Sequence, residues 1–290
     1  MSRPDGVRLR NVFLLPQRQQ RYVRARGQAA NRRSRLKIMM APLTDRLNAA
    51  ALAAELDEKG FVCIENAIDP AWIERAQAYV HGLVAQKGKR YFALNWLSRD
   101  RGTPPQELTD DPQMRRLLMS LAQIGCPRAK LDEEIYTGLR VVAGSSGDEK
   151  SLLHHYDKHV ITALAPILIP EGPKHRAGEL IVFPNRRGYR RFALVNIIEK
   201  AIVQSKWYRN RVSRKLAAGD QANVKYLKPG NLYLFWGYRT YHANFPVAGD
   251  AVRATMLLHY GDPHPGSLIL KANTVRQNRD ERRIAEKALV

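Results

Sequence analysis

Cysteine is scarce in this chain, and long apolar runs are missing. Only two cysteines occur among 290 residues, Cys63 and Cys126, and neither has a second cysteine close by in the sequence. A disulfide framework and a zinc–thiolate site are therefore both disfavoured. No run of about eighteen uncharged apolar residues is present, and the amino terminus is crowded with arginine instead of an apolar secretory core. We expect a soluble, cytoplasmic protein, with peripheral attachment to a membrane left open.

Acidic residues are also few relative to basic ones. The chain has 48 Lys/Arg against 27 Asp/Glu, a net charge of +21. Residues 1–38 contribute +10 and residues 186–228 contribute another +10, which leaves +1 for the rest of the chain. Two interpretations stay open. The basic segments could attract a polyanion, such as a membrane surface, a carrier-linked substrate or nucleic acid, or they could be a solvated tail and a solvated helix face.

Composition also predicts the organisation of the chain. Residues 1–42, rich in Arg and Gln without periodicity, are expected to form a basic, flexible amino-terminal extension. Residues 43–290 are expected to form a single domain. Within it we expect helices over 43–134, a β-rich core over 135–265 and a basic helical insert over about 186–228.

The core region consists of short β-prone segments separated by turns. The segments are YTGLRVVAG, VITALAPILIP, GELIVFP, LYLFWGYRTYHANF and VRATMLLHYG. Short strands with alternating faces and glycine-containing turns favour a barrel or sandwich over a Rossmann fold. No Walker loop or GxGxxG fingerprint is visible, which argues against a nucleotide-phosphate cradle.

Three residues in this region have the chemistry of metal ligands. His155 and Asp157 are two residues apart in HYD, so on a strand their side chains share one face. His242 supplies a third donor from a distant strand. Two histidines and one carboxylate suit a ferrous ion that keeps its other positions open. The alternatives are an exposed polar strand end, a helical zinc pair of His155 with His159, and a core histidine at 242.

Arg253 and Thr255 complete the pattern. Arg253 follows His242 across a Pro/Gly/Asp turn that is expected to make a β-hairpin. Its guanidinium can hold a carboxylate with two parallel hydrogen bonds, and Thr255 lies on the same strand face. The pair suits the distal carboxylate of 2-oxoglutarate. Arg253 could instead form a structural ion pair, and Arg140 and Arg239 are alternative carboxylate-binding residues.

These motifs carry a family resemblance. Over about Ile135–Pro263, the elements HYD, AGELIVFP, PGNLYLFWGYRTYHAN and RAT resemble the iron(II)/2-oxoglutarate-dependent oxygenases, in particular the phytanoyl-CoA dioxygenase-like branch. LAAELDEKGFVCIENAIDPAWIERA is similar to the opening of members of that branch. The resemblance implies a mainly β fold with flanking helices and a double-stranded β-helix core, of the jelly-roll or cupin-like type.

The resemblance also implies chemistry. It implies Fe(II) held by His155, Asp157 and His242, and 2-oxoglutarate held by Arg253 and Thr255. Dioxygen is the other cosubstrate. One carboxylate of 2-oxoglutarate is released as CO2, and the rest of that molecule becomes succinate. Halogenating relatives carry a small residue in place of the carboxylate ligand, so Asp157 favours hydroxylation.

We therefore predict a dioxygenase that hydroxylates an anionic or carrier-linked small molecule or lipid. An anionic membrane surface is a candidate partner, and nucleic acid is a less favoured one. The alternative is a non-catalytic β-barrel protein that engages nucleic acid or an anionic membrane through its basic segments. The sequence indicates neither the oligomeric state nor the substrate.

Overall fold

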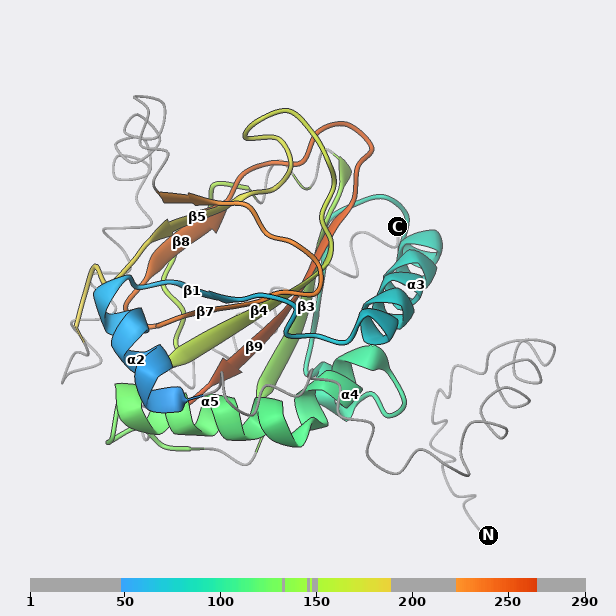
Figure 1. The fold of residues 1–290 in the computed structure, drawn as a ribbon. Coiled ribbons are helices and arrows are strands. Elements are labelled where there is room, and N and C mark those ends of the chain that lie inside the picture. The colour runs from blue at the N-terminus through green and yellow to red at the C-terminus, as the bar shows by residue number, and fades with distance from the viewer. Residues whose placement is uncertain (1–47, 132–133, 145–146, 148–150, 189–222, 265–290) are drawn as a thin grey trace, which may run out of the picture. The chain divides into compact units, whose positions relative to one another are not determined.

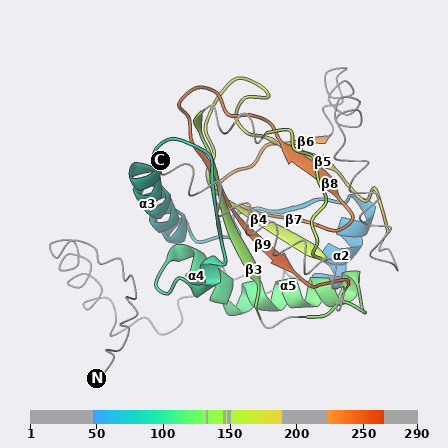
Figure 2. The ribbon, with the colours of Figure 1, turned by 180° about the vertical axis from the view of Figure 1, so that it is seen from behind.

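Two antiparallel β-sheets form the centre of the structure, and helices lie against one of them (Figures 1 and 2). This computed structural model describes residues 48–131, 134–144, 147, 151–188 and 223–264. These residues belong to one compact unit, Ile38–Val290. The predicted extension over 1–42 and most of the predicted helical insert lie outside the described residues.

Four α-helices have a capping side chain immediately before them. They are α2 (Ala49–Glu58), α3 (Pro70–Lys87), α4 (Pro104–Asp110) and α5 (Pro112–Gly125). In each, the preceding Asn, Asp or Thr side chain accepts a hydrogen bond from a backbone N–H of the first turn. Three of them also have proline in the first turn, where its missing N–H costs no hydrogen bond. A short 3-10 helix, η1 (Leu97–Arg99), precedes α4.

Nine strands among the described residues build the two sheets. They are β1 (Val62–Ile64), β2 (Phe92–Asn95), β3 (Tyr136–Val142), β4 (Ile161–Leu168), β5 (Leu180–Phe183), β6 (Val224–Lys225), β7 (Leu232–Phe235), β8 (Tyr241–Asn244) and β9 (Arg253–Tyr260). The larger sheet has the order β1-β7-β4-β9-β3-β2, and the smaller has the order β6-β5-β8. An isolated bridge between His155 and His242 adds one more segment beside β8.

The strand order defines the fold as a double-stranded β-helix, the jelly roll that the family resemblance implied. From β3 onward the chain passes repeatedly from one sheet to the other: β3, β4, β7 and β9 lie in the larger sheet, and the 155 segment, β5, β6 and β8 in the smaller one. Eight segments distributed in this way, with β9 between β3 and β4, are the arrangement of a jelly roll. β1 and β2 extend the edges of the larger sheet.

Alternation along β9 separates two environments. Ala254, Met256 and Leu258 belong to the main hydrophobic core, which they share with buried residues of the helices. Leu257 packs instead against a second cluster, which contains residues of both sheets and therefore lies between them. The other residues on its face of the strand, Arg253, Thr255 and His259, are buried polar side chains. β9 thus places a row of polar side chains in the space between the two sheets.

Two expectations about connections are wrong. β8 and β9 do not form a hairpin, because β8 pairs with β5 while β9 pairs with β3 and β4. The segment LYLFWGYRTYHANF is two strands in different sheets, β7 and β8, because the chain turns between them at residues 236–240. In the part of the chain that the structure describes, no helix is long and apolar enough to cross a membrane.

Candidate metal centre

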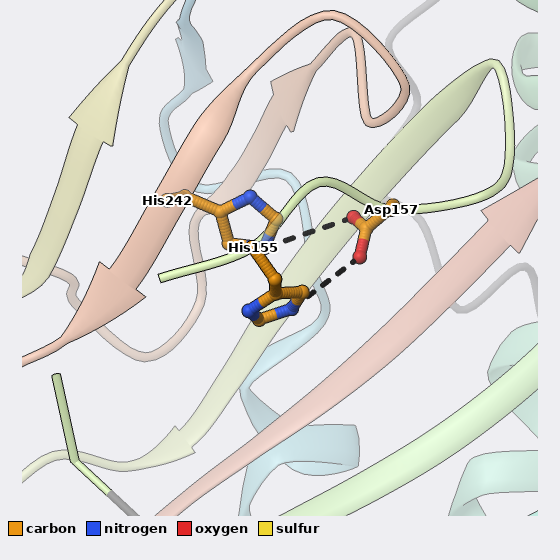
Figure 3. A group of neighbouring side chains, drawn as sticks. All are labelled: His155, Asp157 and His242. Carbon is orange, nitrogen blue, oxygen red and sulfur yellow. Dashed lines mark ion pairs between the residues drawn. The ribbon is translucent and has the colours of Figure 1, made fainter. Parts of the chain in front are cut away.

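His155, Asp157 and His242 converge at one end of the smaller sheet (Figure 3). His242 lies in β8, and His155 sits beside it in the isolated bridge. Asp157 follows in the loop that leads to β4, where its backbone N–H donates to the carbonyl of Gly237. Residues 155 and 157 present their side chains to the same point, although they do not share a strand as expected, because His155 lies in an isolated bridge and Asp157 outside any strand.

The donor atoms are close enough to share an ion. His155 Nε2 is 3.7 Å from Asp157 Oδ1, and His242 Nε2 is 3.8 Å from Asp157 Oδ2. One ligand atom of each of the three residues lies within 4.8 Å of the others. Ligands at roughly 2.0–2.2 Å from one ion can be no more than about 4.4 Å apart, so the distance between His155 Nε2 and Asp157 Oδ1 fits a shared ion, and His242 Nε2 faces the same carboxylate.

Main-chain carbonyls orient both imidazoles. His155 Nδ1 lies 2.9 Å from the carbonyl oxygen of Leu153, and His242 Nδ1 lies 3.2 Å from that of Thr240. A carbonyl only accepts, so each Nδ1 carries the proton and each Nε2 keeps its lone pair. This is how second-sphere contacts prepare histidines for a metal.

Burial and neighbouring charges set the protonation of the centre. Burial lowers the pKa of His242 to about 4, so the ring is neutral at pH 7 and can act as a ligand. Burial alone would raise the pKa of Asp157, but His242, His259, His155 and the Thr162 hydroxyl together hold it well below its usual range. The three residues thus offer two imidazole nitrogens and one carboxylate, the donor set of a ferrous facial triad.

Arg253 and Thr255 point into the jelly roll and leave donors unused. Arg253 is 3% exposed and Thr255 is 2% exposed. Arg253 Nε and Thr255 Oγ1 have no hydrogen-bond partner among the described residues. Buried polar atoms of this kind cost free energy unless something pairs with them. A carboxylate bound in the interior would satisfy both.

The surroundings of Arg253 keep its guanidinium charged and give it room. Burial lowers its pKa to about 10, against the opposing effect of Glu179, so it stays protonated at neutral pH. The Glu179 carboxylate accepts from the backbone N–H groups of His175 and Ala177. Gly178, between Ala177 and Glu179, has φ +72°, and a Cβ there would lie 2.3 Å from Arg253 Cδ. Glycine at 178 therefore leaves the space that the arginine fills.

The other candidate residues are engaged elsewhere. Arg239 is paired with Asp57 at 2.6 Å, and Arg140 donates to Asn95 Oδ1 at 2.8 Å. His154, the histidine that precedes His155 in the sequence, is buried against the ring of Tyr241, with ring centroids 5.2 Å apart. His159 cannot form a helical zinc pair with His155, because the described segment around them is not helical.

Sequence reasoning missed two residues of the centre. Thr162 in β4 donates its hydroxyl to Asp157 Oδ2 at 2.6 Å, and His259 in β9 lies 2.9 Å from that hydroxyl through Nδ1. His259 could have been found, because it lies six residues after Arg253 and an even spacing places both on one strand face. Thr162 carried no signal, since threonine is an ordinary strand residue.

A cavity of about 470 Å³ is lined in part by His259, whose Nδ1 lies 3.6 Å from Asp157 Oδ2, but His155, Asp157 and His242 are not part of its lining. Rings make up much of its wall: Trp96, Tyr136, His159, His259 and Tyr260 line it, together with Glu134, Lys158, Gly261 and Asp262. His159 and His259 stack with centroids 5.4 Å apart, and Tyr136 contacts both. Its size is within the range of small-molecule sites.

Comparisons with known proteins give likeness in structure alone. No family model matches the chain, and no curated protein matches it in sequence. Similar solved structures include a prolyl 4-hydroxylase from Phytophthora capsici, with 15% identity and a TM-score of 0.48 over 80% of this chain and 70% of that one. EctD from S. alaskensis with bound Fe has 15% identity and a TM-score of 0.49, over 78% of this chain and 82% of that one.

A third similar structure is the epimerase SnoN in complex with Fe3+, alpha ketoglutarate and nogalamycin RO. It has 16% identity and a TM-score of 0.49, over 75% of this chain and 85% of that one. The fold assigned to the present chain rests on its own strand order.

Proposed function

We propose that this chain is an iron(II)/2-oxoglutarate-dependent oxygenase. The observation that carries the proposal is the combination of two features in one jelly roll. One is the preoriented group of His155, Asp157 and His242. The other is a charged, buried arginine with an unpaired donor, Arg253, on the inner face of β9. A metal that also binds a keto acid needs both features, and a purely structural metal would need only the first.

The residues of the site have two roles, metal binding and keto-acid binding. Bound Fe(II) with 2-oxoglutarate supplies dioxygen activation, coupled to oxidative decarboxylation of the keto acid to succinate and CO2. His155, Asp157 and His242 would hold the metal through Nε2, a carboxylate oxygen and Nε2. Arg253 and Thr255 would hold the distal carboxylate of the keto acid, with the guanidinium providing charge and geometry.

The cavity beside His259 is the proposed place for the substrate. Its lining includes His259, which lies beside Asp157, together with other aromatic rings and charges of both signs, Glu134, Lys158 and Asp262. Hydroxylation is the proposed outcome because Asp157 occupies the third ligand position. An anionic or carrier-linked substrate, the phytanoyl-CoA dioxygenase-like branch and attachment to an anionic membrane also remain proposals from the sequence.

Succinate formation tests the proposal. Purified protein with Fe(II), ascorbate and 2-oxoglutarate should form succinate, with oxygen dependence, and Asp157→Ala should abolish this. His81→Ala, at an exposed position of α3, should leave the slow, substrate-independent formation of succinate intact. Equal succinate formation by the wild type and Asp157→Ala would refute the proposal. No observation on the described residues favours the non-catalytic alternative, and most of its basic segments lie outside them.

A further inference from the structure

Two buried side chains, Thr162 and His259, form a chain of hydrogen bonds that ends on the Asp157 carboxylate. Thr162 Oγ1 donates to Asp157 Oδ2 at 2.6 Å, and Thr162 Oγ1 and His259 Nδ1 are 2.9 Å apart. His259 Nδ1 itself lies 3.6 Å from Asp157 Oδ2, beyond hydrogen-bond distance. The hydroxyl is therefore the link between the histidine and the carboxylate.

Chemistry fixes the direction of these bonds. An ionised carboxylate only accepts, so the single hydroxyl proton of Thr162 is directed at Asp157. The threonine oxygen must then accept from His259, which requires the proton of the neutral imidazole to be on Nδ1. Asp157 Oδ2 is taken by this chain, while Oδ1 receives no hydrogen bond from the described residues and remains available as a ligand.

The two supporting residues belong to the most regular part of the fold. Thr162 and His259 are direct partners in the register between β4 and β9, two central strands of the larger sheet. Asp157 lies in a loop outside any strand. The sheet thus sets the position of the Asp157 carboxylate, while the backbone N–H of the same residue donates to the Gly237 carbonyl.

The backbone at Gly237 packs against the contact between Thr162 and Asp157. A Cβ at this residue would lie 2.3 Å from Thr162 Oγ1 and 3.1 Å from Asp157 Oδ2. The backbone therefore approaches the threonine–aspartate contact so closely that no side chain fits. Such close packing limits the carboxylate to a small range of orientations.

We propose that Thr162 and His259 are positioning residues that orient Asp157, so that Oδ1 is the oxygen presented to the metal. The inference rests on the proposed function, since it assumes a metal at the triad. It assigns roles to two residues that touch neither the ion nor the keto acid. His259 would then have two roles, because the same ring also lines the cavity proposed for the substrate.

Metal affinity, measured without turnover, tests the positioning role. Co(II) is titrated into the metal-free protein and followed by its visible ligand-field spectrum, for the wild type, Thr162→Val, Thr162→Ser and His259→Leu. Removing a second-sphere partner typically weakens metal binding by about 10- to 100-fold. We expect that loss, with an altered spectrum, for Thr162→Val and His259→Leu. Thr162→Ser keeps the hydroxyl and should stay within about threefold of the wild type.

The outcomes separate this inference from the function on which it rests. Wild-type affinity and spectrum in both Thr162→Val and His259→Leu would overturn the positioning role while leaving the metal centre standing. Absence of Co(II) binding by the wild type would overturn both. Should Thr162→Val fail to fold, as judged by circular dichroism, His259→Leu decides by the same criterion. A role of His259 in the cavity wall alone would change the KM for substrate without changing metal affinity.

Discussion

His155 and His242 are direct partners across an antiparallel bridge. The backbone N–H of His155 donates to the carbonyl of His242 at 2.9 Å, and the N–H of His242 donates to that of His155 at 3.0 Å. Their ring centroids are 4.4 Å apart. The separation of the two imidazoles is thus set by main-chain pairing, which is more rigid than side-chain packing alone. Two of the three donors are therefore positioned before any ion arrives.

Metal binding should stabilise the folded protein measurably. A ligand at 100 times its dissociation constant adds about 2.7 kcal/mol to the free energy of unfolding. Thermal unfolding of the wild type should therefore shift to higher temperature with Co(II) and return with a chelator. His242→Ala should abolish the shift, while His81→Ala, at an exposed position of α3, should preserve it. A full shift in His242→Ala would contradict the proposed ligand role.

Arg253→Lys should weaken binding of 2-oxoglutarate although it keeps the positive charge. Lysine cannot make the two parallel hydrogen bonds of a guanidinium, and each bond to a charged group contributes about 1.5–3 kcal/mol. We expect the KM for 2-oxoglutarate in succinate formation to rise about 10- to 100-fold. Arg140→Lys, whose arginine is bonded to Asn95, serves as the control. An equal effect of both substitutions would contradict the assignment of Arg253.

Gly178→Ala should affect the same binding step through the backbone. The new methyl group would lie 2.3 Å from Arg253 Cδ and displace the side chain. Gly249→Ala is the matched control, because Gly249 also has a positive φ, +53°, but its Cβ would meet nothing within 4 Å. Both should lose about 1–2 kcal/mol of stability from the strained backbone, measured by urea unfolding. Only Gly178→Ala should also raise the KM for 2-oxoglutarate.

Sequence patterns predicted which residues belong to the site better than they predicted which strands bring those residues together. The spacing of His155 and Asp157 predicted a shared direction, and the even spacing of Arg253 and Thr255 predicted a shared face, because both depend on local backbone geometry. The predicted hairpin between His242 and Arg253 was wrong. A Pro/Gly turn marks a reversal, but which strands then pair depends on the whole sheet order.

The contacts that support Asp157 could not be predicted from the sequence, for a related reason. Thr162 and Asp157 are close in the chain, but their hydrogen bond depends on the approach of Gly237 and on the register of β4 with β9. These are relations between distant segments, and no local pattern records them. The short alternating segments with glycine turns predicted a barrel or sandwich, and the family resemblance, not the pattern, implied the double-stranded β-helix.

Two helical glycines should respond to alanine in opposite ways. At Gly125, the last residue of α5, a Cβ would lie 2.5 Å from the ring of Trp236, which is fully buried. Overpacking of this kind costs about 1–3 kcal/mol. At Gly82 in α3 a Cβ meets nothing within 4 Å, so Gly82→Ala should stabilise the protein by about 0.5–1 kcal/mol. Urea unfolding midpoints check both, and a stabilised Gly125→Ala would contradict the packing described.

The most direct test of the oxygenase proposal needs neither the substrate nor oxygen. Fe(II) and 2-oxoglutarate are added anaerobically to the wild type, Asp157→Ala and Arg253→Gln, and the visible metal-to-ligand charge-transfer absorption of a keto acid chelated to Fe(II) is recorded. The account predicts a saturable band in the wild type, no band in Asp157→Ala, and in Arg253→Gln a band that requires about 10- to 100-fold more 2-oxoglutarate. Absence of the band in the wild type, or an unchanged band in Asp157→Ala, would contradict it.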